Sequence, residues 1–158
     1  MAFENIIKNA AKESMEGTRT GDKKEEVLAI QNYIKNAKKV FVPNKNNIKT
    51  QVINGILEKY GISKAKNLDI NTNSADSHRF PCISKATMAL DQSDADMIIG
   101  RGRLGIPGSG SMLVFMDNKG RILTAGFSPS HVVHKKSLEE AVRDETIMAL
   151  KRIGLEES

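Results

Sequence analysis

The stretch that decides the fold runs from Ala95 to Ala125 and reads ADMIIGRGRLGIPGSGSMLVFMDNKGRILTA. Its three apolar runs, at residues 95–100, 112–116 and 121–125, predict three strands. The first run is almost continuously apolar, as expected of a strand that is buried on both faces of a sheet. Asp117–Gly120 separates the other two runs, and its glycine suits a hairpin turn between antiparallel strands. The stretch therefore predicts the centre of a sheet that contains a hairpin.

Helices and further strands are predicted on both sides of this stretch. Apolar periodicity and turn residues predict helices at 2–16, 23–36, 48–60 and 82–91, strands at 39–42 and 67–71, and a loop at 72–80. A final helix begins at the capping box Ser137–Glu140 and ends before Gly154. Strands that alternate with helices, together with one hairpin, predict an α/β fold with a mixed central sheet flanked by helices. No repeat or linker divides the sequence, so we expect a single domain over residues 1–158.

The composition is that of a globular protein, with 39% hydrophobic and 27% charged residues. No apolar run approaches the roughly 18–20 residues that a membrane span needs. The opening residues carry charge early and lack the apolar segment of a signal peptide. Cys82 is the only cysteine, which excludes an internal disulfide and a cysteine-based metal cluster. We therefore expect a cytoplasmic protein without a membrane partner.

The net charge of +5 is concentrated in the first part of the chain. Residues 1–66 carry 13 Lys and Arg against 7 Asp and Glu, whereas residues 67–158 carry 11 against 12. A basic segment is compatible with an anionic partner and equally with a solvated lysine-rich face. The sequence has no Trp, two Tyr and five Phe, which leaves few rings for stacking bases. These numbers favour a nucleotide over a nucleic acid as the partner.

Two arginines and five of the 12 glycines lie between Gly100 and Ser111. Glycine lets the backbone N–H groups approach an anion, and the guanidinium groups of Arg101 and Arg103 match phosphate or carboxylate. The segment follows a buried strand, where open α/β sheets bind their ligands. It lacks the Gly-Lys-Ser/Thr ending of a Walker loop. We predict an anion site here; the alternative is a crossover loop with solvated arginines. Further predicted contacts are Gly102, Gly108, Ser109, Gly110 and Ser111.

A second anion site is predicted at another strand-to-helix junction, Asn44–Lys49. Asn44, Asn46 or Asn47 can cap the helix that follows, and a helix N-terminus attracts phosphate. Lys45 and Lys49 would add cations for a polyphosphate. Capping alone accounts for the asparagines equally well.

Histidines and carboxylates near predicted strand ends are the remaining candidates. His131 and His134 have a spacing that can chelate a metal, but no further ligand is close in sequence, so a polar loop is the favoured interpretation. A contact between His131 and a substrate stays open, as does one from Ser128. Mg²⁺ takes one or two carboxylates plus substrate phosphates. Asp76 and Asp117 are our candidates among the carboxylates that lie near strand ends, which also include Asp69 and Asp96.

The run from Ala95 to His134, together with VFVPNKNN at 40–47 and TNSADSHRFPCISKA at 72–86, resembles a known enzyme family. This is the guanylyltransferase family HcgB, which helps to build the iron–guanylylpyridinol (FeGP) cofactor of a hydrogenase of methanogenic archaea. The segment RGRLGIPGSGS is long and unusual, and the resemblance extends along essentially the whole chain.

The resemblance implies a reaction in which GTP and a substituted pyridinol give guanylylpyridinol and pyrophosphate, with Mg²⁺ and in a homodimer. It also implies a fold similar to nucleoside triphosphate pyrophosphatases (ITPase/Maf-like), whose first strand ends in an Asn-x-x-Lys nucleotide loop. Asn46–Lys49 has this spacing, but Val42-Pro43 replaces the Thr/Ser-Gly that precedes it in those enzymes.

By the same resemblance, Arg101, Arg103 and the loop lysines would neutralise the triphosphate, and His131 would assist the pyridinol hydroxyl. The glycine-rich segment could hold either the triphosphate or a pyridinol carboxylate. Two alternatives remain at this point: a nucleoside triphosphate pyrophosphatase, in which water replaces the pyridinol, and a nucleotide- or RNA-binding module without catalysis.

Overall fold

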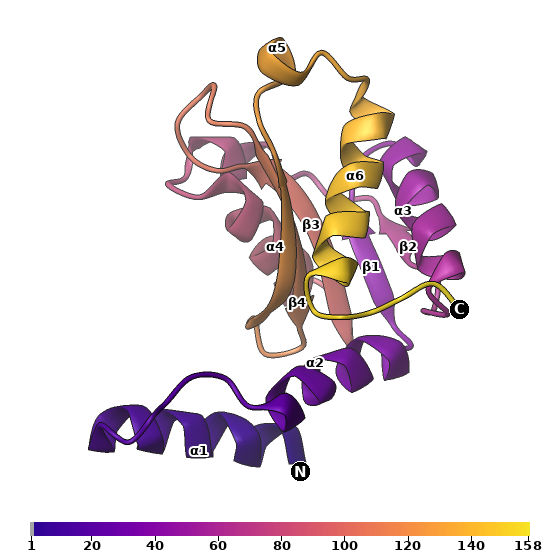
Figure 1. Ribbon diagram of the computed structural model, residues 1–158. Helices are drawn as coiled ribbons and strands as arrows, with labels where there is room; N and C mark the ends of the chain where they lie inside the picture. The colour runs from indigo at the N-terminus through magenta and orange to yellow at the C-terminus, as the bar shows by residue number, and fades with distance from the viewer. Residues whose placement is uncertain (1) are drawn as a thin grey trace.

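The computed structural model describes residues 2–158, in which five strands form one mixed sheet (Figure 1). The strand order is β2-β1-β3-β4-β5. Strand β1 (Val40–Pro43) pairs in parallel with β2 (Lys66–Leu68) and with β3 (Met97–Arg103). Strands β4 (Ser111–Asp117) and β5 (Ile122–Ser128) continue the sheet as antiparallel neighbours. The prediction of a mixed sheet flanked by helices is confirmed.

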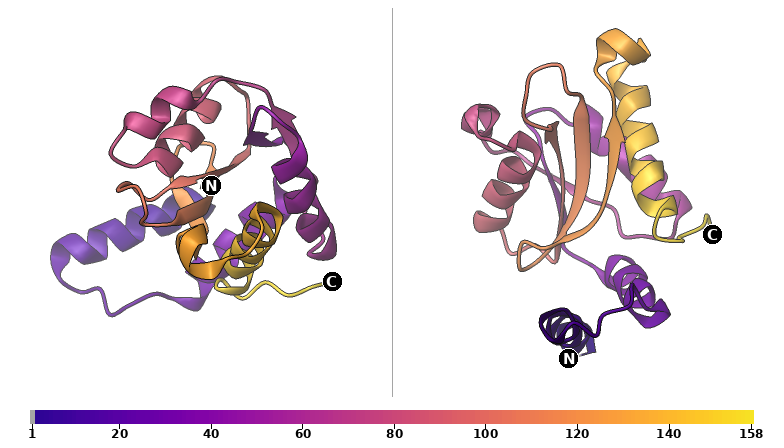
Figure 2. Two further views of the ribbon diagram at one scale, coloured as in Figure 1. Left: turned by 90° about the horizontal axis from the view of Figure 1, so that it is seen from above. Right: turned by 60° about the vertical axis from the view of Figure 1, so that its left-hand side comes forward.

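Helices cover both faces of the sheet (Figures 1 and 2). Helices α3 (Ile48–Lys59) and α6 (Leu138–Lys151) lie on one face, and α4 (Pro81–Asp91) lies on the other. Side chains alternate along a strand, so Met97 and Ile99 of β3 join the core under α3 and α6, whereas Ile98 joins the core under α4. By the same alternation, Arg101 and Arg103 at the end of β3 project from one face of the sheet.

Two further helices, α1 (Ala2–Glu16) and α2 (Lys24–Asn36), lie at the end of the sheet that holds the β4–β5 turn (Figure 1). The Tyr33 hydroxyl of α2 donates a hydrogen bond to the Asp96 carbonyl oxygen at 2.6 Å. Glu4 of α1 pairs with Arg121 at 2.7 Å, and this guanidinium lowers the pKa of Glu4 to about 2. These contacts place α1 and α2 at the opposite end of the sheet from Arg101 and Arg103.

The structure moves several predicted boundaries. Strand β3 runs on to Arg103 instead of ending at Gly100, so both arginines are strand residues and the glycine-rich loop covers only residues 104–110. Strand β5 continues to Ser128, and β2 ends at Leu68 rather than at residue 71. The loop predicted at 72–80 contains the 3₁₀ helix η1 (Asn73–Ser77), and the polar segment after β5 contains the short helix α5 (His131–His134).

Candidate active site

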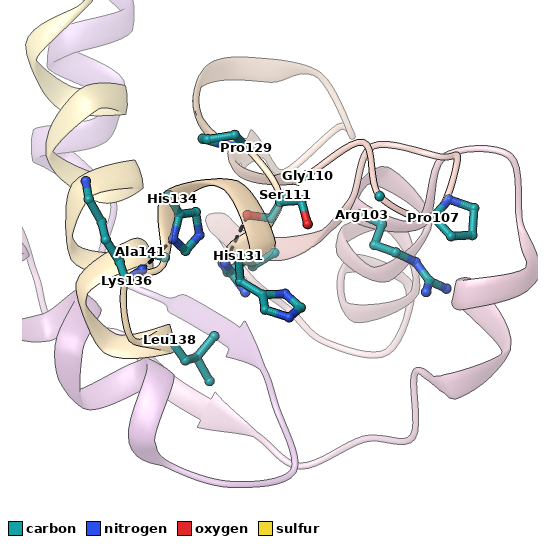
Figure 3. Close-up of a pocket in the computed structure, with 13 residues that line it drawn as sticks. Arg103, Pro107, Gly110, Ser111, Pro129, His131, His134, Lys136, Leu138 and Ala141 are labelled. Atoms are coloured by element: carbon teal, nitrogen blue, oxygen red, sulfur yellow. Dashed lines mark hydrogen bonds between the residues drawn. The ribbon is translucent and has the colours of Figure 1, made fainter.

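A pocket of about 510 Å³ opens where β3 ends and β4 begins. The loop 104–110 forms one side, and α5 with the start of α6 forms the other; Figure 3 shows Arg103 and Pro107 across from His134 and Lys136. Six of the predicted site residues line the pocket: Arg101, Arg103, Gly108, Gly110, Ser111 and His131. The other lining residues are Pro107, Pro129, Ser130, His134, Lys136, Leu138 and Ala141.

Arg101 lies in the pocket wall and pairs with Glu145 of α6. Its Nε donates to Glu145 Oε1 at 2.7 Å, and its Nη2 donates to Glu145 Oε2 at 3.1 Å. The Glu145 side chain is fully buried, and that of Arg101 is 15% exposed. Glu145 was missed by the sequence reasoning, although a glutamate between Val142 and Ala149 falls within the apolar stripe of the last helix. An acidic residue in such a stripe is the signal that could have identified it.

Ser111 completes this arrangement, but not as the donor that the sequence predicts. Its hydroxyl accepts from Arg101 Nη2 at 2.9 Å and donates to Glu145 Oε2 at 2.6 Å. A serine hydroxyl has one proton, and here that proton is directed to Glu145. Ser111 therefore shapes the pocket wall and holds Arg101, while its donor capacity faces away from a ligand.

Arg103 connects the pocket to the segment before α4. Its Nη2 donates to the Asp76 carbonyl oxygen at 3.1 Å and lies 3.9 Å from the Asp76 carboxylate. Lys85 of α4 lies 3.1 Å from the same carboxylate oxygen. Lys85 was not identified from the sequence, where it is one lysine within an ordinary helix. The structure thus brings a cation from α4 to the predicted anion site.

Lys49, at the start of α3, faces the same region. Burial, followed by the neighbouring cations Arg101 and Lys85, lowers the pKa of Lys49. Arg101 and Arg103 line the pocket, and Lys85 shares the Asp76 carboxylate with Arg103. Together with Lys49 they form a group of positive charges here called the cationic cluster. Clustered cations without enough acidic partners attract an anionic ligand.

The rest of the Asn44–Lys49 segment serves mainly to join β1 to α3. The N-cap residue of α3 is Asn47, whose side chain makes no capping hydrogen bond, while Asn46 Oδ1 accepts from the Ile48 N–H at 3.1 Å. Lys45 is exposed. Asn44 Nδ2 is buried and has no hydrogen-bond partner among residues 2–158. A buried unpaired donor is costly, and this one does not reach the pocket lining.

Three other predicted contacts lie outside the pocket lining. Gly102 faces α4, where a Cβ atom would come within 2.9 Å of the Cys82 Cα, so close helix packing explains this glycine. The Ser109 hydroxyl donates to the Ile106 carbonyl oxygen at 2.6 Å and closes the tip of the loop. Ser128 is buried and pairs with Ser111 in the sheet.

The structure separates the two carboxylates that were candidates for Mg²⁺. Asp117 is fully buried at the far end of β4, where it accepts from the N–H groups of Lys119 and Arg121 and from Arg121 Nε. Its oxygens therefore shape the hairpin turn. Asp76 is exposed beside the cationic cluster, where its Oδ1 lies 3.1 Å from Lys85 and 3.9 Å from Arg103. Over residues 2–158, no group of three or more His, Cys, Asp or Glu side chains could hold a metal ion.

The histidines of α5 have different surroundings. His134 Nδ1 accepts from the Lys136 N–H at 2.8 Å, which leaves Nε2 to face the pocket (Figure 3). His131 is exposed on the same short helix and also lines the pocket.

Cys82 of α4 is buried against the sheet, and burial raises the pKa of its thiol to about 12. The thiol is thus a packing group.

A mixed α/β sheet with arginines and lysines gathered at the ends of its parallel strands defines a protein that handles an anionic substrate. The family model of the FeGP cofactor biosynthesis protein HcgB, guanylyltransferase, matches residues 3–155. The chain belongs to this family, and it is a nucleotidyltransferase that acts in FeGP cofactor biosynthesis. None of the helices described for residues 2–158 is long and apolar enough to cross a membrane.

Proposed function

We propose that the protein transfers GMP from GTP to the ring hydroxyl of a substituted pyridinol and releases pyrophosphate. The observation that carries this proposal is the position of the cationic cluster beside a pocket with an apolar wall. Such an arrangement can hold a polyanion and a flat ring next to each other, with Arg101 and Arg103 common to both parts.

The triphosphate is assigned to the cationic cluster. Lys49 and Lys85 come from the N-terminal halves of α3 and α4, and Arg101 and Arg103 come from the end of β3. Phosphoryl transfer depends on positioning and on neutralising charge; Lys49, Lys85 and Arg103 can supply the charge, and Arg101 the positioning. GTP would enter as its magnesium complex. The exposed carboxylate of Asp76 is the one best placed for this ion, because the Asp117 oxygens serve the turn.

The pyridinol is assigned to the pocket. Pro107, Pro129, Leu138 and Ala141 give it apolar lining on which a ring can rest. Arg103 and Lys136 lie on opposite sides of the pocket, and either one suits a carboxylate on the ring (Figure 3). Under this proposal, the loop 104–110 faces the pyridinol, while Arg101 and Arg103 also reach the triphosphate.

The reaction itself needs one proton acceptor. The pyridinol oxygen attacks the α-phosphorus of GTP, the bond from that phosphorus to the bridging oxygen of pyrophosphate breaks, and pyrophosphate leaves. His131, exposed in the pocket lining, is the group that we assign to take the hydroxyl proton. A histidine can accept this proton near neutral pH.

Incubation with GTP, Mg²⁺ and a carboxylated pyridinol tests the proposal. The expected products are guanylylpyridinol and pyrophosphate in equal amounts, identified by mass spectrometry, with little turnover when the pyridinol is omitted. Rapid release of GMP from GTP alone would instead identify a pyrophosphatase. Tight, salt-dependent binding of RNA without turnover would identify a nucleic-acid-binding module.

The family resemblance also leads us to propose that the protein is a homodimer. Sedimentation equilibrium would then give twice the mass of one chain. A monomer at micromolar concentration would contradict this part of the proposal.

A further inference from the structure

Glu145 is a fully buried carboxylate directly beneath the pocket. A charge taken out of water needs a partner and hydrogen bonds to balance the loss of solvation. Glu145 has three such bonds, two from Arg101 and one from Ser111, at 2.6–3.1 Å. A side chain that served packing alone would be apolar at this position, as its neighbours Val142 and Ala149 are.

The main chain of α6 fixes the position of this carboxylate. At Gly126 of β5, an added Cβ atom would collide with the Glu145 carbonyl oxygen, so helix and strand are in direct backbone contact here. Val142 and Ala149 anchor the helix on either side. Because the core sets the place of Glu145, the guanidinium of Arg101 is held by a rigid partner.

The hydrogen bonds also decide which part of Arg101 remains free. A guanidinium has five N–H donors. The Nε–H and one Nη2–H go to Glu145, and the second Nη2–H goes to Ser111. The two N–H groups of Nη1 have no hydrogen-bond partner among residues 2–158.

We propose that Glu145 is a positioning residue, which holds Arg101 so that its Nη1 donors serve the anionic ligand of the pocket. The carboxylate offsets the charge of Arg101, so Arg101 contributes direction to recognition more than net charge. The inference rests on the proposed function only in taking the ligand of this site to be an anion.

A ligand-free measurement tests the geometry. In a ¹⁵N spectrum of the full chain, the Arg101 Nε–H signal, assigned by its loss in Arg101→Lys, is expected to exchange slowly with solvent. Glu145→Gln should speed this exchange at least tenfold. Thr146→Val, which removes a buried hydroxyl of the same helix, should leave it unchanged. Slow exchange that persists in Glu145→Gln would overturn the proposal.

Turnover measurements test whether the positioning of Arg101 by Glu145 matters for catalysis. Glu145→Gln is expected to lower kcat/KM by about 10- to 100-fold, the range for losing a hydrogen bond to a charged group. In an Arg101→Ala background, Glu145→Gln should cause no further loss, because it acts through Arg101. Losses that multiply in the double variant would refute the inference.

Glu145→Asp is a more conservative variant for the same two measurements, the exchange of the Arg101 Nε–H and kcat/KM. Glu145→Asp retains the charge but shortens the reach by one methylene, so it replaces Glu145→Gln if the latter does not fold. We expect intermediate values of exchange and of kcat/KM, and wild-type values in both would contradict the proposal. If the wild type shows a protected Nε–H that Glu145→Gln removes, but no guanylyl transfer, the positioning role stands and the proposed reaction fails.

Discussion

Asp76 and Arg103 are joined through both the main chain and the side chain of the aspartate. Arg103 Nη2 lies 3.1 Å from the Asp76 carbonyl oxygen and 3.9 Å from its Oδ1 atom. The first contact fixes the end of β3 to the segment before α4, and the second sets a guanidinium beside a carboxylate. Lys85 lies 3.1 Å from the same Oδ1. The pair therefore presents an exposed carboxylate beside the cationic cluster.

The exposed carboxylate of Asp76 leads to a prediction about magnesium. Asp76→Asn should raise the Mg²⁺ concentration for half-maximal turnover about tenfold, equivalent to about 1.4 kcal/mol. Asp117→Asn is the matched control, because its carboxylate stabilises the turn; it should lower the free energy of unfolding by about 1–3 kcal/mol and leave the Mg²⁺ dependence unchanged. Mg²⁺ titrations of the initial rate measure the first effect, and urea unfolding measures the second. Equal Mg²⁺ dependence in wild type and Asp76→Asn would contradict the assignment.

The apolar lining of the pocket leads to a prediction about the acceptor. Leu138→Ala should raise KM for the pyridinol about fivefold, since truncating a half-exposed leucine removes about 1 kcal/mol of contact. The KM for GTP should change less than twofold. Met148→Ala shortens a similarly exposed side chain of α6 outside the pocket lining and should alter neither constant. A rise in KM for GTP alone would place the nucleotide in the pocket.

Lys49 leads to a prediction about pH. Only the protonated amine attracts the triphosphate, and the pKa of Lys49 is lowered by burial and by neighbouring cations from the ordinary 10.5. GTP affinity should therefore be constant at neutral pH and decrease as the pH rises through the lowered pKa, before ordinary lysines lose their charge. Lys49→Arg should remove this alkaline decrease, since arginine stays protonated.

The control for this prediction is Lys45→Arg, a change at an exposed lysine of the same segment. It should retain the wild-type profile in calorimetric titrations with GTP between pH 7 and 10. An identical alkaline decrease in Lys49→Arg would exclude Lys49 as its source.

The packing of Gly102 leads to a prediction about stability. Gly102→Ala should lower the free energy of unfolding by about 1–3 kcal/mol, because the new methyl would press on the backbone of α4 at Cys82. Gly55→Ala in α3 is the matched control: its Cβ would meet nothing within 4 Å in residues 2–158, so a gain of about 0.4–1 kcal/mol is expected. Urea unfolding measures both, and a neutral Gly102→Ala would show that α4 can shift.

The fold was largely predictable from local sequence patterns. The apolar runs on either side of Asp117–Gly120 specify a hairpin, and the capping box at Ser137–Glu140 specifies the start of α6, as the structure confirms. The predicted end of β3 was wrong, because glycines at 100 and 102 indicate a loop when only neighbours in sequence are considered. Their cause is non-local: α4 crosses β3 so closely that a Cβ at either position would meet Ala86 or Cys82.

The site was predictable only in part. Arginine between glycines is a strong chemical pattern, and Arg101 and Arg103 do line the pocket. Glu145 and Lys85 come from helices distant in sequence, and only the packing of those helices brings them to the arginines. The roles of the hydroxyl groups depend on hydrogen-bond direction, which residue type does not reveal.

Cys82 has a practical consequence. It is the only thiol of the chain, it belongs to α4 and is buried in the core, and its pKa of about 12 leaves almost no thiolate at neutral pH. A cysteine placed at Ile106, which is 76% exposed at the tip of the loop beside the pocket, would thus be modified selectively in the otherwise natural sequence. An environment-sensitive dye attached there would report the occupancy of the pocket in real time.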